Sequence, residues 1–220
     1  MTSVTFPVYL DGKAQPTPGK HPFTVPTKAL ADAIAAEWQA HKKFAPSKMP
    51  LTSLAYTAID RIHGQEAQII EALLVYVDTD TLSYRATSSE TLAQRQQGEW
   101  DPILAWAGKK FGARWEVTSG VMPLQQPKAL HDSLQKYLQT LNAMRLSAAC
   151  LLASGLSSLA LALAVLEKRV DAAEAFRLSR LEEEAQAERW GRDADSDGRA
   201  QRLKDEVLTA ERFLRLLDAP

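Results

Sequence analysis

An uncharged stretch of 21 residues constrains the fold of this chain more than any other feature. Residues 146–166, LSAACLLASGLSSLALALAVL, contain no Asp, Glu, Lys or Arg, and this length is enough to cross a bilayer. The stretch is nevertheless rich in Ala and Ser and lacks the aromatic residues found at membrane interfaces. A helix that is apolar all round is buried in a protein core or in a membrane. We predict a central core helix over about 144–167, with a membrane-associated segment as the alternative.

Length and charge argue against several classes of protein. The 220 residues can bury a core without disulfide or metal staples. The 26 basic and 27 acidic residues give a net charge of -1, which argues against a nucleic-acid partner. Cys150 is the single cysteine, which favours a reducing compartment. The amino terminus shows neither a signal peptide nor a transit peptide, so we expect a cytoplasmic, monomeric protein.

The first part of the chain mixes strand and helix patterns. Short β-prone runs from Val4 to Val25 alternate with Pro and Gly, and Asp11-Gly12 is a hairpin signal. Helical periodicity begins after Thr27, a predicted N-cap, and again covers residues 51–62 before Gly64. We also expect a helix over 67–77 and a strand over 81–86.

Helices dominate beyond residue 88. Asp101-Pro102 predicts a bend between helices at 89–100 and 102–111. A short strand over 114–118 and helices at about 127–141, 144–167, 171–190 and 198–217 follow. The fold class is therefore α+β in two domains. Residues 1–86 form a small amino-terminal α+β domain with an antiparallel sheet, and residues 87–220 form a larger, all-helical carboxy-terminal domain.

The chain shows no strong signature of an enzyme or a metal site. Residues 193–198 copy the first half of an EF-hand loop, but Lys204 stands where the loop needs a bidentate Glu. An acidic connecting loop is the better interpretation. Gly19-Lys20 lacks the earlier Gly of a phosphate-binding loop, and Cys150 has no neighbouring base. We expect no catalytic residue, no metal and no cofactor.

Residues 178–191, LSRLEEEAQAERWG, combine acids and aromatic residues on one helix. Helical geometry places Glu182 at the edge of the inward face and Glu183 nearly opposite that face. Phe176, Glu183 and Trp190 are spaced by seven residues. Such a helix is either enclosed within the domain or faces a partner, and the pattern alone favours enclosure.

Four segments together resemble one known family. They are LDGKAQPTPGKHPFTVPTKALADAIAAEW, MPLTSLAYTAIDR, WDPILAWAGKKFGARWEVTSGVMP and LSRLEEEAQAERWG, and the resemblance covers about residues 8–191. In this order and spacing they are similar to the assembly-chaperone family for the alpha subunit of the ATP synthase catalytic head. The resemblance implies a non-enzymatic, two-domain chaperone that binds the free alpha subunit and prevents its aggregation until beta arrives. The missing transit peptide suits a bacterial member or a mature form.

The resemblance also assigns roles to residues. The Glu-Trp pair of the family falls on Glu37-Trp38, and Trp38 also follows Leu30 and Ile34 on an apolar stripe, so we expect a structural core residue. The acidic motif of the family and its flanking aromatics give the client-binding candidates Glu182, Glu183, Glu184, Phe176 and Trp190. Glu183 is the first candidate because it points outward. Ala185 and the tail after Gly191 depart from the family pattern. An enzyme with an unrecognised site, such as a small hydrolase, is the alternative function.

Overall fold

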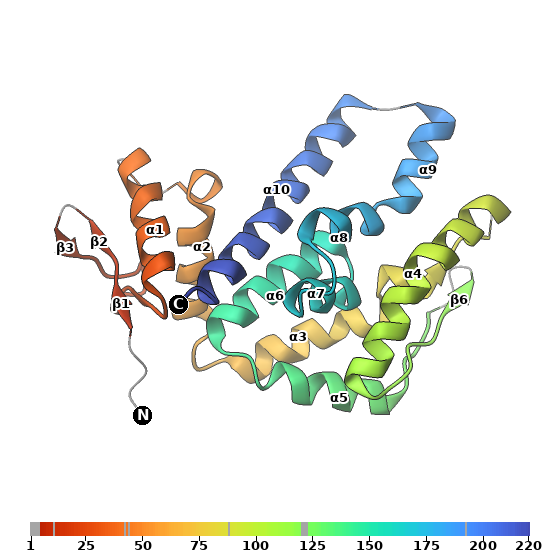
Figure 1. Cartoon of the computed structure of the whole chain (residues 1–220), viewed down its shortest axis with the longest axis horizontal. Helices are drawn as coiled ribbons and strands as arrows, with labels where there is room; N and C mark the ends of the chain where they lie inside the picture. The colour runs from red at the N-terminus through yellow and green to blue at the C-terminus, as the bar shows by residue number, and fades with distance from the viewer. Residues whose placement is uncertain are drawn as a thin grey trace.

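The computed structural model describes residues 5–10, 12–41, 43, 45–87, 89–119, 123–191 and 193–220. A small part with strands lies beside a larger helical body, and the last helix, α10 (Ala194–Leu217), runs from one to the other (Figure 1). Antiparallel strands near the amino terminus are followed by a mainly helical chain. This arrangement confirms the predicted α+β class.

Two short antiparallel pairs open the chain. β1 (Phe6–Pro7) pairs with β4 (Thr24–Val25), and β2 (Tyr9–Leu10) pairs with β3 (Lys13–Ala14). The second pair is the predicted hairpin. Gly12 in its turn has a φ of 73°, a conformation that glycine adopts without strain. Val4 and Asp11, which belong to the same prediction, lie outside the described residues.

Two helices complete the small part. In α1 (Lys28–Ala40) the Thr27 side chain accepts a hydrogen bond from the Leu30 N–H, which confirms the predicted cap. A 3₁₀ turn (Pro46–Lys48) leads into α2 (Pro50–Thr57), which continues as a π-helical turn (Ala58–Ile62). The chain then turns at Gly64, whose φ is 82°, so the predicted helix over 51–62 is confirmed.

Asp60 on the π-helical turn holds the loop that follows β3. Its carboxylate accepts hydrogen bonds from the Thr17 hydroxyl and the Gly19 N–H, and lies 2.9 Å from His21 Nδ1. A Cβ at position 19 would lie 2.7 Å from Asp60 Oδ1, so glycine lets the Asp60 carboxylate approach the backbone this closely. Burial raises the pKa of Asp60, but these hydrogen bonds and the charge of His21 outweigh burial and bring the pKa below its usual value. The Gly19-Lys20 loop therefore holds a carboxylate of its own chain.

The predicted strands at 81–86 and 114–118 are correct only in part. After α3 (Glu66–Asp78), Thr81–Ser83 form a 3₁₀ turn because the Asp80 side chain caps it through the Leu82 N–H. β5 (Tyr84–Arg85) follows and pairs in parallel with β6 (Thr118–Ser119). This pairing joins chain segments from both sides of residue 86. The domain division at that residue stays a prediction.

The predicted bend at Asp101-Pro102 is wrong, because α4 (Glu90–Phe111) continues through Pro102. A proline inside a helix loses one hydrogen bond and crowds the carbonyl four residues earlier. Trp100 and Ile103 flank the proline and are both buried, so burial of this helix face offsets the lost bond.

The long apolar helix predicted over 144–167 is two helices. After α5 (Lys128–Leu138), α6 (Ala143–Leu156) ends where Ser157 adopts a φ of 48°, and α7 (Leu159–Leu166) begins with Ser158 as its cap. The buried Asp80 carboxylate accepts hydrogen bonds from the Ser158 hydroxyl at 2.7 Å and the Ala160 N–H at 2.9 Å. These bonds stabilise the break, which periodicity does not reveal.

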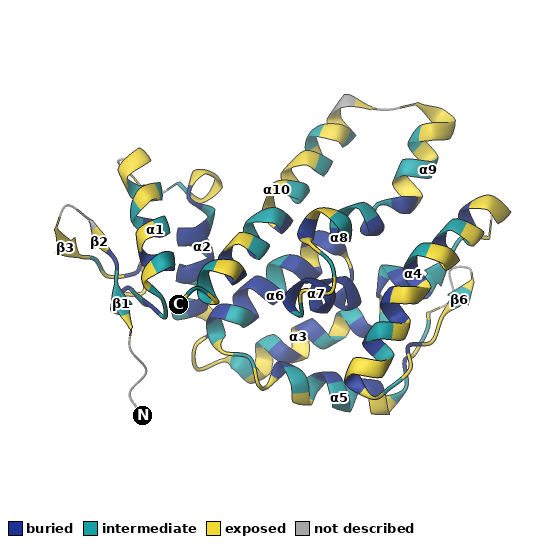
Figure 2. Cartoon of the chain, in the orientation of Figure 1, coloured by how far each residue is buried: buried dark blue, intermediate teal, exposed yellow. Residues whose placement is uncertain are grey.

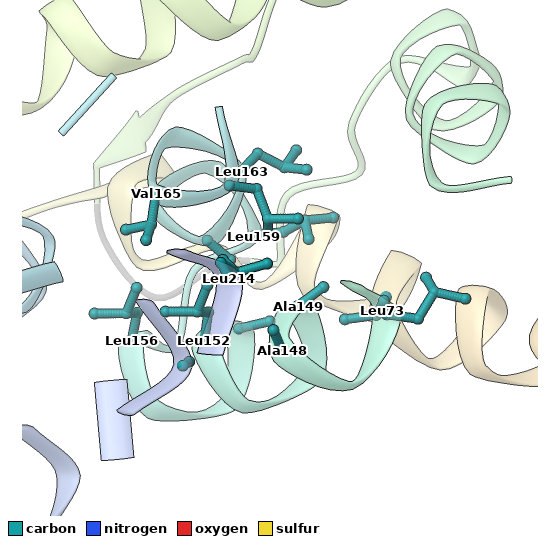
Figure 3. Packing of buried hydrophobic residues seen from close by; sticks show 14 of the residues in the cluster. Leu73, Ala148, Ala149, Leu152, Leu156, Leu159, Leu163, Val165 and Leu214 are labelled. Atoms are coloured by element: carbon teal, nitrogen blue, oxygen red, sulfur yellow. The ribbon is translucent and has the colours of Figure 1, made fainter. Parts of the chain in front are cut away.

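The prediction that this apolar stretch forms the centre of the core is confirmed. Every residue of α7 is buried, and α7 packs against α3, α4, α6 and α8 (Ala172–Ser179). Figure 3 shows leucines of α6 and α7 interdigitating with Leu73 of α3 and Leu214 of α10. A Cβ at Gly155 would lie 2.9 Å from Val207, so this glycine allows α10 to approach α6. Over the described ranges, every helix is too short or too polar to cross a membrane.

The end of α10 returns to the amino-terminal part. The Thr27 hydroxyl donates a hydrogen bond to the Leu216 carbonyl at 2.7 Å, and α10 packs against α1 and α2. Asp218, just beyond the helix, pairs with Arg145 and Lys168. The carboxy-terminal helix therefore ties the two parts of the chain together.

Candidate functional site

The acidic motif lies on α9 (Leu181–Trp190), a helix separate from α8. The predicted single helix over 171–190 is wrong, because Arg180 leaves helical geometry with a φ of -111° and a ψ of 12°. The start of α10 faces α9, and together they project from the helical body as a hairpin (Figure 1). α10 begins at Ala194, earlier than predicted, because the Asp193 side chain accepts a hydrogen bond from the Ser196 N–H at 3.0 Å.

The EF-hand-like residues belong to this helix start. Asp195 and Asp197 lie in the first turn of α10, where carboxylates favourably face the amino-terminal end of the helix dipole. A calcium loop needs these residues in a non-helical loop that wraps the ion. In the part of the chain that the structure describes, no cluster of three acidic, His or Cys residues is arranged for a metal.

Two adjoining hollows follow the hairpin. The first has a volume of about 360 Å³ and the second about 320 Å³. Phe176, Glu183, Glu184 and Trp190 line the first, and Glu182 and Glu183 line the second. The structure therefore brings all five predicted client-binding residues to one region. We call the surface formed by these five residues the α9 surface.

The exposure of α9 shows that the helix is not enclosed. Trp190 is 77% exposed, and Figure 2 shows the exposed outer end of α9. Glu182 and Glu183 are exposed as well. The expectation that Glu182 lies at the edge of the core is wrong, because the break at Arg180 changes the direction of the helix. Tryptophan is enriched in surfaces that contact another protein, so the exposed Trp190 makes α9 a candidate contact surface.

Glu183 has one cationic neighbour, while Glu184 faces another helix. Glu183 Oε1 lies 2.6 Å from Arg180 Nη1, at the break that begins α9. Glu184 Oε2 lies 3.7 Å from Arg95 on α4. Although its ion pair is the closer one, the Glu183 side chain is 46% exposed against 37% for Glu184, which agrees with its place as the first candidate.

A network of charges fixes α9 and α8 against α4. Arg95 lies 3.0 Å from Glu99 and 3.7 Å from Glu188, and Arg177 lies 2.5 Å from Glu99. Burial raises the pKa of the Glu99 carboxyl, but hydrogen bonds from Arg95 and Arg177 and their charges lower it below its usual value. The network keeps Glu99 ionised and positions α9. Sequence reasoning missed it, since its only local signal is the spacing of Arg95 and Glu99.

Two other sequence candidates lie outside this site. Trp38 is half-buried on α1 and packs against the hydrophobic core, as expected of a structural residue, although it is not fully enclosed. Cys150 is partly buried on α6, and burial raises the pKa of its thiol to about 11. A thiol with so high a pKa is a poor nucleophile.

Comparison with known proteins places this geometry among chaperones. The family described as ATP12 chaperone protein matches residues 2–108. Protein atp12, mitochondrial, of Schizosaccharomyces pombe is 26% identical over 197 residues, an alignment that covers 84% of this chain and 68% of the yeast protein. The crystal structure of Atp12 from Paracoccus denitrificans matches with a TM-score of 0.90 and 40% identity over 96% of this chain and 91% of that one. An Agrobacterium tumefaciens protein assigned as a chaperone matches with a TM-score of 0.89 and 34% identity, over 99% of this chain and 81% of that one.

Proposed function

Because the chain belongs to the ATP12 chaperone family, we propose that it binds the free alpha subunit of the ATP synthase catalytic head. In this proposal it covers the surface of alpha that later meets beta, and so keeps alpha from aggregating. Membership of a chaperone family favours this function over the small hydrolase considered from the sequence.

The observation that carries the proposal is the exposed tryptophan of the α9 surface. Trp190 is 77% exposed at the end of a projecting hairpin, and its ring lies 4.9 Å from the Arg189 guanidinium. Tryptophan is enriched among the residues that dominate protein interfaces, where its ring gives up water contacts on binding. An apolar patch of the client would cover this ring.

Acidic side chains around the tryptophan would set the orientation of the client. Glu183 is exposed and lines the first hollow together with Trp190, and it shares the second hollow with the exposed Glu182. Complementary charge speeds encounter and selects the register of an interface. We therefore assign Glu183 a contact with a basic group of the client.

A release step by competition completes the proposal. Covering an interface needs area and shape complementarity, and a partner that binds the same surface of alpha more tightly would displace the chaperone. We expect beta to be that partner, and we expect the chaperone to act as a monomer in a bacterial cytoplasm.

An aggregation assay tests the function. Purified alpha subunit is diluted from denaturant with and without this protein, in buffer free of nucleotide, and light scattering is followed. The proposal expects scattering to fall when an equimolar amount of this protein is present. It expects scattering to rise again when this protein is then removed and no beta subunit is supplied in its place. Equal scattering in both samples, with this protein shown to be folded, would contradict it.

A further inference from the structure

A second groove lies between the latter half of α4 and the segment that follows it. Its volume is about 660 Å³, and it lies at the edge of the helical body, where α4 and β6 run together (Figure 1). It is lined by Asp101, Leu104, Ala105, Gly108, Lys109, Gly112, Ala113, Arg114, Trp115 and Val117. We call it the α4 groove. None of its residues belongs to the α9 surface.

Small residues form the α4 side of this groove. Ala105 and Gly108 on α4 and Gly112 just past its end line the groove with small residues, alongside the larger Asp101, Leu104 and Lys109. A Cβ at Gly108 would lie 3.3 Å from the Ala113 carbonyl oxygen. The glycine therefore allows Ala113 and Arg114 to pass close to the helix, and the groove is the channel of about 660 Å³ beside them.

Trp115 and Val117 form the other side. They stand two residues apart, as side chains on the same face of an extended chain do. Trp115 is only 3% exposed, whereas Val117 is 44% exposed. Val117 is thus an apolar side chain left open to solvent beside a buried aromatic ring, in a groove that could cover it.

The buried polar atom of the α4 groove that lacks a partner among the described residues is a donor. The Trp115 indole Nε1–H is buried, and within the described ranges it has no hydrogen-bond partner. The backbone groups of the neighbouring Glu116 have partners, because its N–H donates to Gln126 Oε1 at 2.8 Å and its carbonyl accepts from Gln126 Nε2 at 2.9 Å. A buried donor without an acceptor is costly, so an occupant with acceptors would stabilise this site.

The charged side chains of the α4 groove that lack an ion-pair partner among the described residues are positive. Lys109 and Arg114 are exposed, and neither forms an ion pair with another described residue. The acid of the groove, Asp101, is neutralised by Arg85, whose Nη2 lies 2.6 Å from Asp101 Oδ1. The groove therefore offers two free positive charges and no free negative one.

We propose that the α4 groove binds an extended segment of the client protein that carries apolar side chains and at least one Asp or Glu. The apolar side chains cover Val117, a backbone or carboxylate oxygen accepts from Trp115, and the acid pairs with Lys109 or Arg114. This inference rests on the proposed chaperone function. It adds a second contact whose charge is opposite to that of the acidic α9 surface, so the two surfaces engage different parts of the client.

A groove-filling variant tests the inference with purified alpha subunit as the probe. Ala105→Trp fills the channel from an exposed helix position, and Val75→Trp adds the same bulk at an exposed position of α3, outside the groove. We expect Ala105→Trp to weaken binding about tenfold, as loss of an interface contact of ordinary strength does. Val75→Trp leaves binding unchanged, and thermal melting shows that both variants fold.

Two double variants test whether an Asp or Glu of the client pairs with Lys109 or Arg114. Lys109→Glu with Arg114→Glu reverses both free charges, and Lys13→Glu with Lys136→Glu makes the same change in net charge elsewhere. We expect the first pair to weaken binding about tenfold and the second to have a smaller effect. Equal effects of the two pairs would overturn the inference, since binding would then follow net charge alone.

Crosslinking identifies the occupant directly. A photoreactive phenylalanine at Val117 should crosslink to one segment of alpha that contains Asp or Glu, whereas the same group at Val75 should not. If wild-type protein binds alpha and Glu183→Lys abolishes binding, while Ala105→Trp binds normally and Val117 gives no crosslink, the groove inference fails and the proposed function stands. Absence of binding by the wild-type protein would refute the proposed function itself.

Discussion

The Glu37 carboxylate holds the start of α2 through Thr52. Glu37 Oε2 accepts hydrogen bonds from the Thr52 N–H at 2.9 Å and from the Thr52 hydroxyl at 2.7 Å. Its other oxygen accepts from the Leu51 N–H at 2.9 Å. An acid from α1 therefore caps α2, which has no capping side chain at its own start. Glu37, the acid of the Glu37-Trp38 pair found in the sequence, therefore has a structural role.

Glu37→Gln should destabilise the protein. The amide NH₂ of glutamine cannot accept a hydrogen bond, so one helix-start N–H loses its partner, at a cost of about 1–3 kcal/mol. Urea unfolding measures the change. Glu71→Gln, at an exposed position of α3, is the matched control and should leave the unfolding midpoint in place. Equal midpoints for the two variants would mean that the cap contributes nothing.

Trp38→Arg should also lower stability, by an amount limited by the exposure of its ring. Trp38 packs against the core but is only half-buried. We expect a loss of about 2 kcal/mol, below the ~3–5 kcal/mol typical of a fully buried aromatic residue. Thermal melting measures it, with Trp190→Arg at the exposed end of α9 as the control. A melting temperature unaffected by Trp38→Arg would show that the ring does not support the core.

Periodicity in the sequence predicted most helices and the core, but not where helices break. The predictions for α1 and α2 rested on apolar spacing and local caps, which neighbouring residues determine. The break at Ser157 has a different origin. There the Ser158 hydroxyl and the Ala160 N–H both donate hydrogen bonds to Asp80, a residue from a distant part of the chain. Only the tertiary fold brings that acid to the break.

The residues of the candidate site could be named from the sequence, but the helix geometry around them could not be predicted. The acidic motif and Trp190 were found from the resemblance. The wheel that placed Glu182 at the core edge assumed a single straight helix, and the break at Arg180 invalidated that assumption. The α4 groove escaped prediction because α4 passes through Pro102 and because the buried, unpartnered indole of Trp115 leaves no mark in the sequence.

Asp80 should make stability depend on pH. Burial raises its pKa to about 6, although hydrogen bonds from the Ala160, Leu82 and Leu159 backbone and from the Ser158 hydroxyl oppose the shift. Its unfolded pKa is about 3.9. A raised carboxyl pKa means that the folded state holds the proton more tightly, so this contribution to stability is full below about pH 4 and is lost as pH rises through 6. The predicted contribution is on the order of 3 kcal/mol.

Comparison with Asp80→Asn isolates this contribution. The amide does not titrate, so the free energy of unfolding of the wild type, relative to the variant, should rise between pH 7.5 and pH 4.5. Urea unfolding at both pH values measures it. A difference that stays constant, or that shrinks in acid, would show that the pKa of Asp80 is not raised.

Calcium should not stabilise the protein through residues 193–198. Asp195 and Asp197 lie in the first turn of α10, and Lys204 carries a positive charge where an EF-hand needs its bidentate acid. Calorimetry with calcium should show no binding. A micromolar signal that Asp195→Ala removes would contradict this prediction.

Glu182→Lys should leave stability unchanged, contrary to the expectation from a helical wheel. Its side chain is exposed, and isolated surface substitutions change the free energy of unfolding by less than about 0.5 kcal/mol. Thermal melting against Leu181→Ala, a substitution of a fully buried neighbour, sets the scale. A large loss in Glu182→Lys would place this residue in the core.

The affinity of Glu183→Lys for purified alpha subunit tests the central claim most directly. Glu183 is exposed and lines both hollows of the α9 surface. Loss of its surface ion pair with Arg180 costs only about 0–1 kcal/mol, so the variant should melt close to the wild-type temperature. Reversing a charge inside an interface costs about 2–5 kcal/mol of binding free energy, so calorimetry should show alpha-subunit binding weakened at least tenfold, with Glu71→Lys binding normally. Wild-type affinity in Glu183→Lys would contradict the account, because the α9 surface would then not be where the client binds.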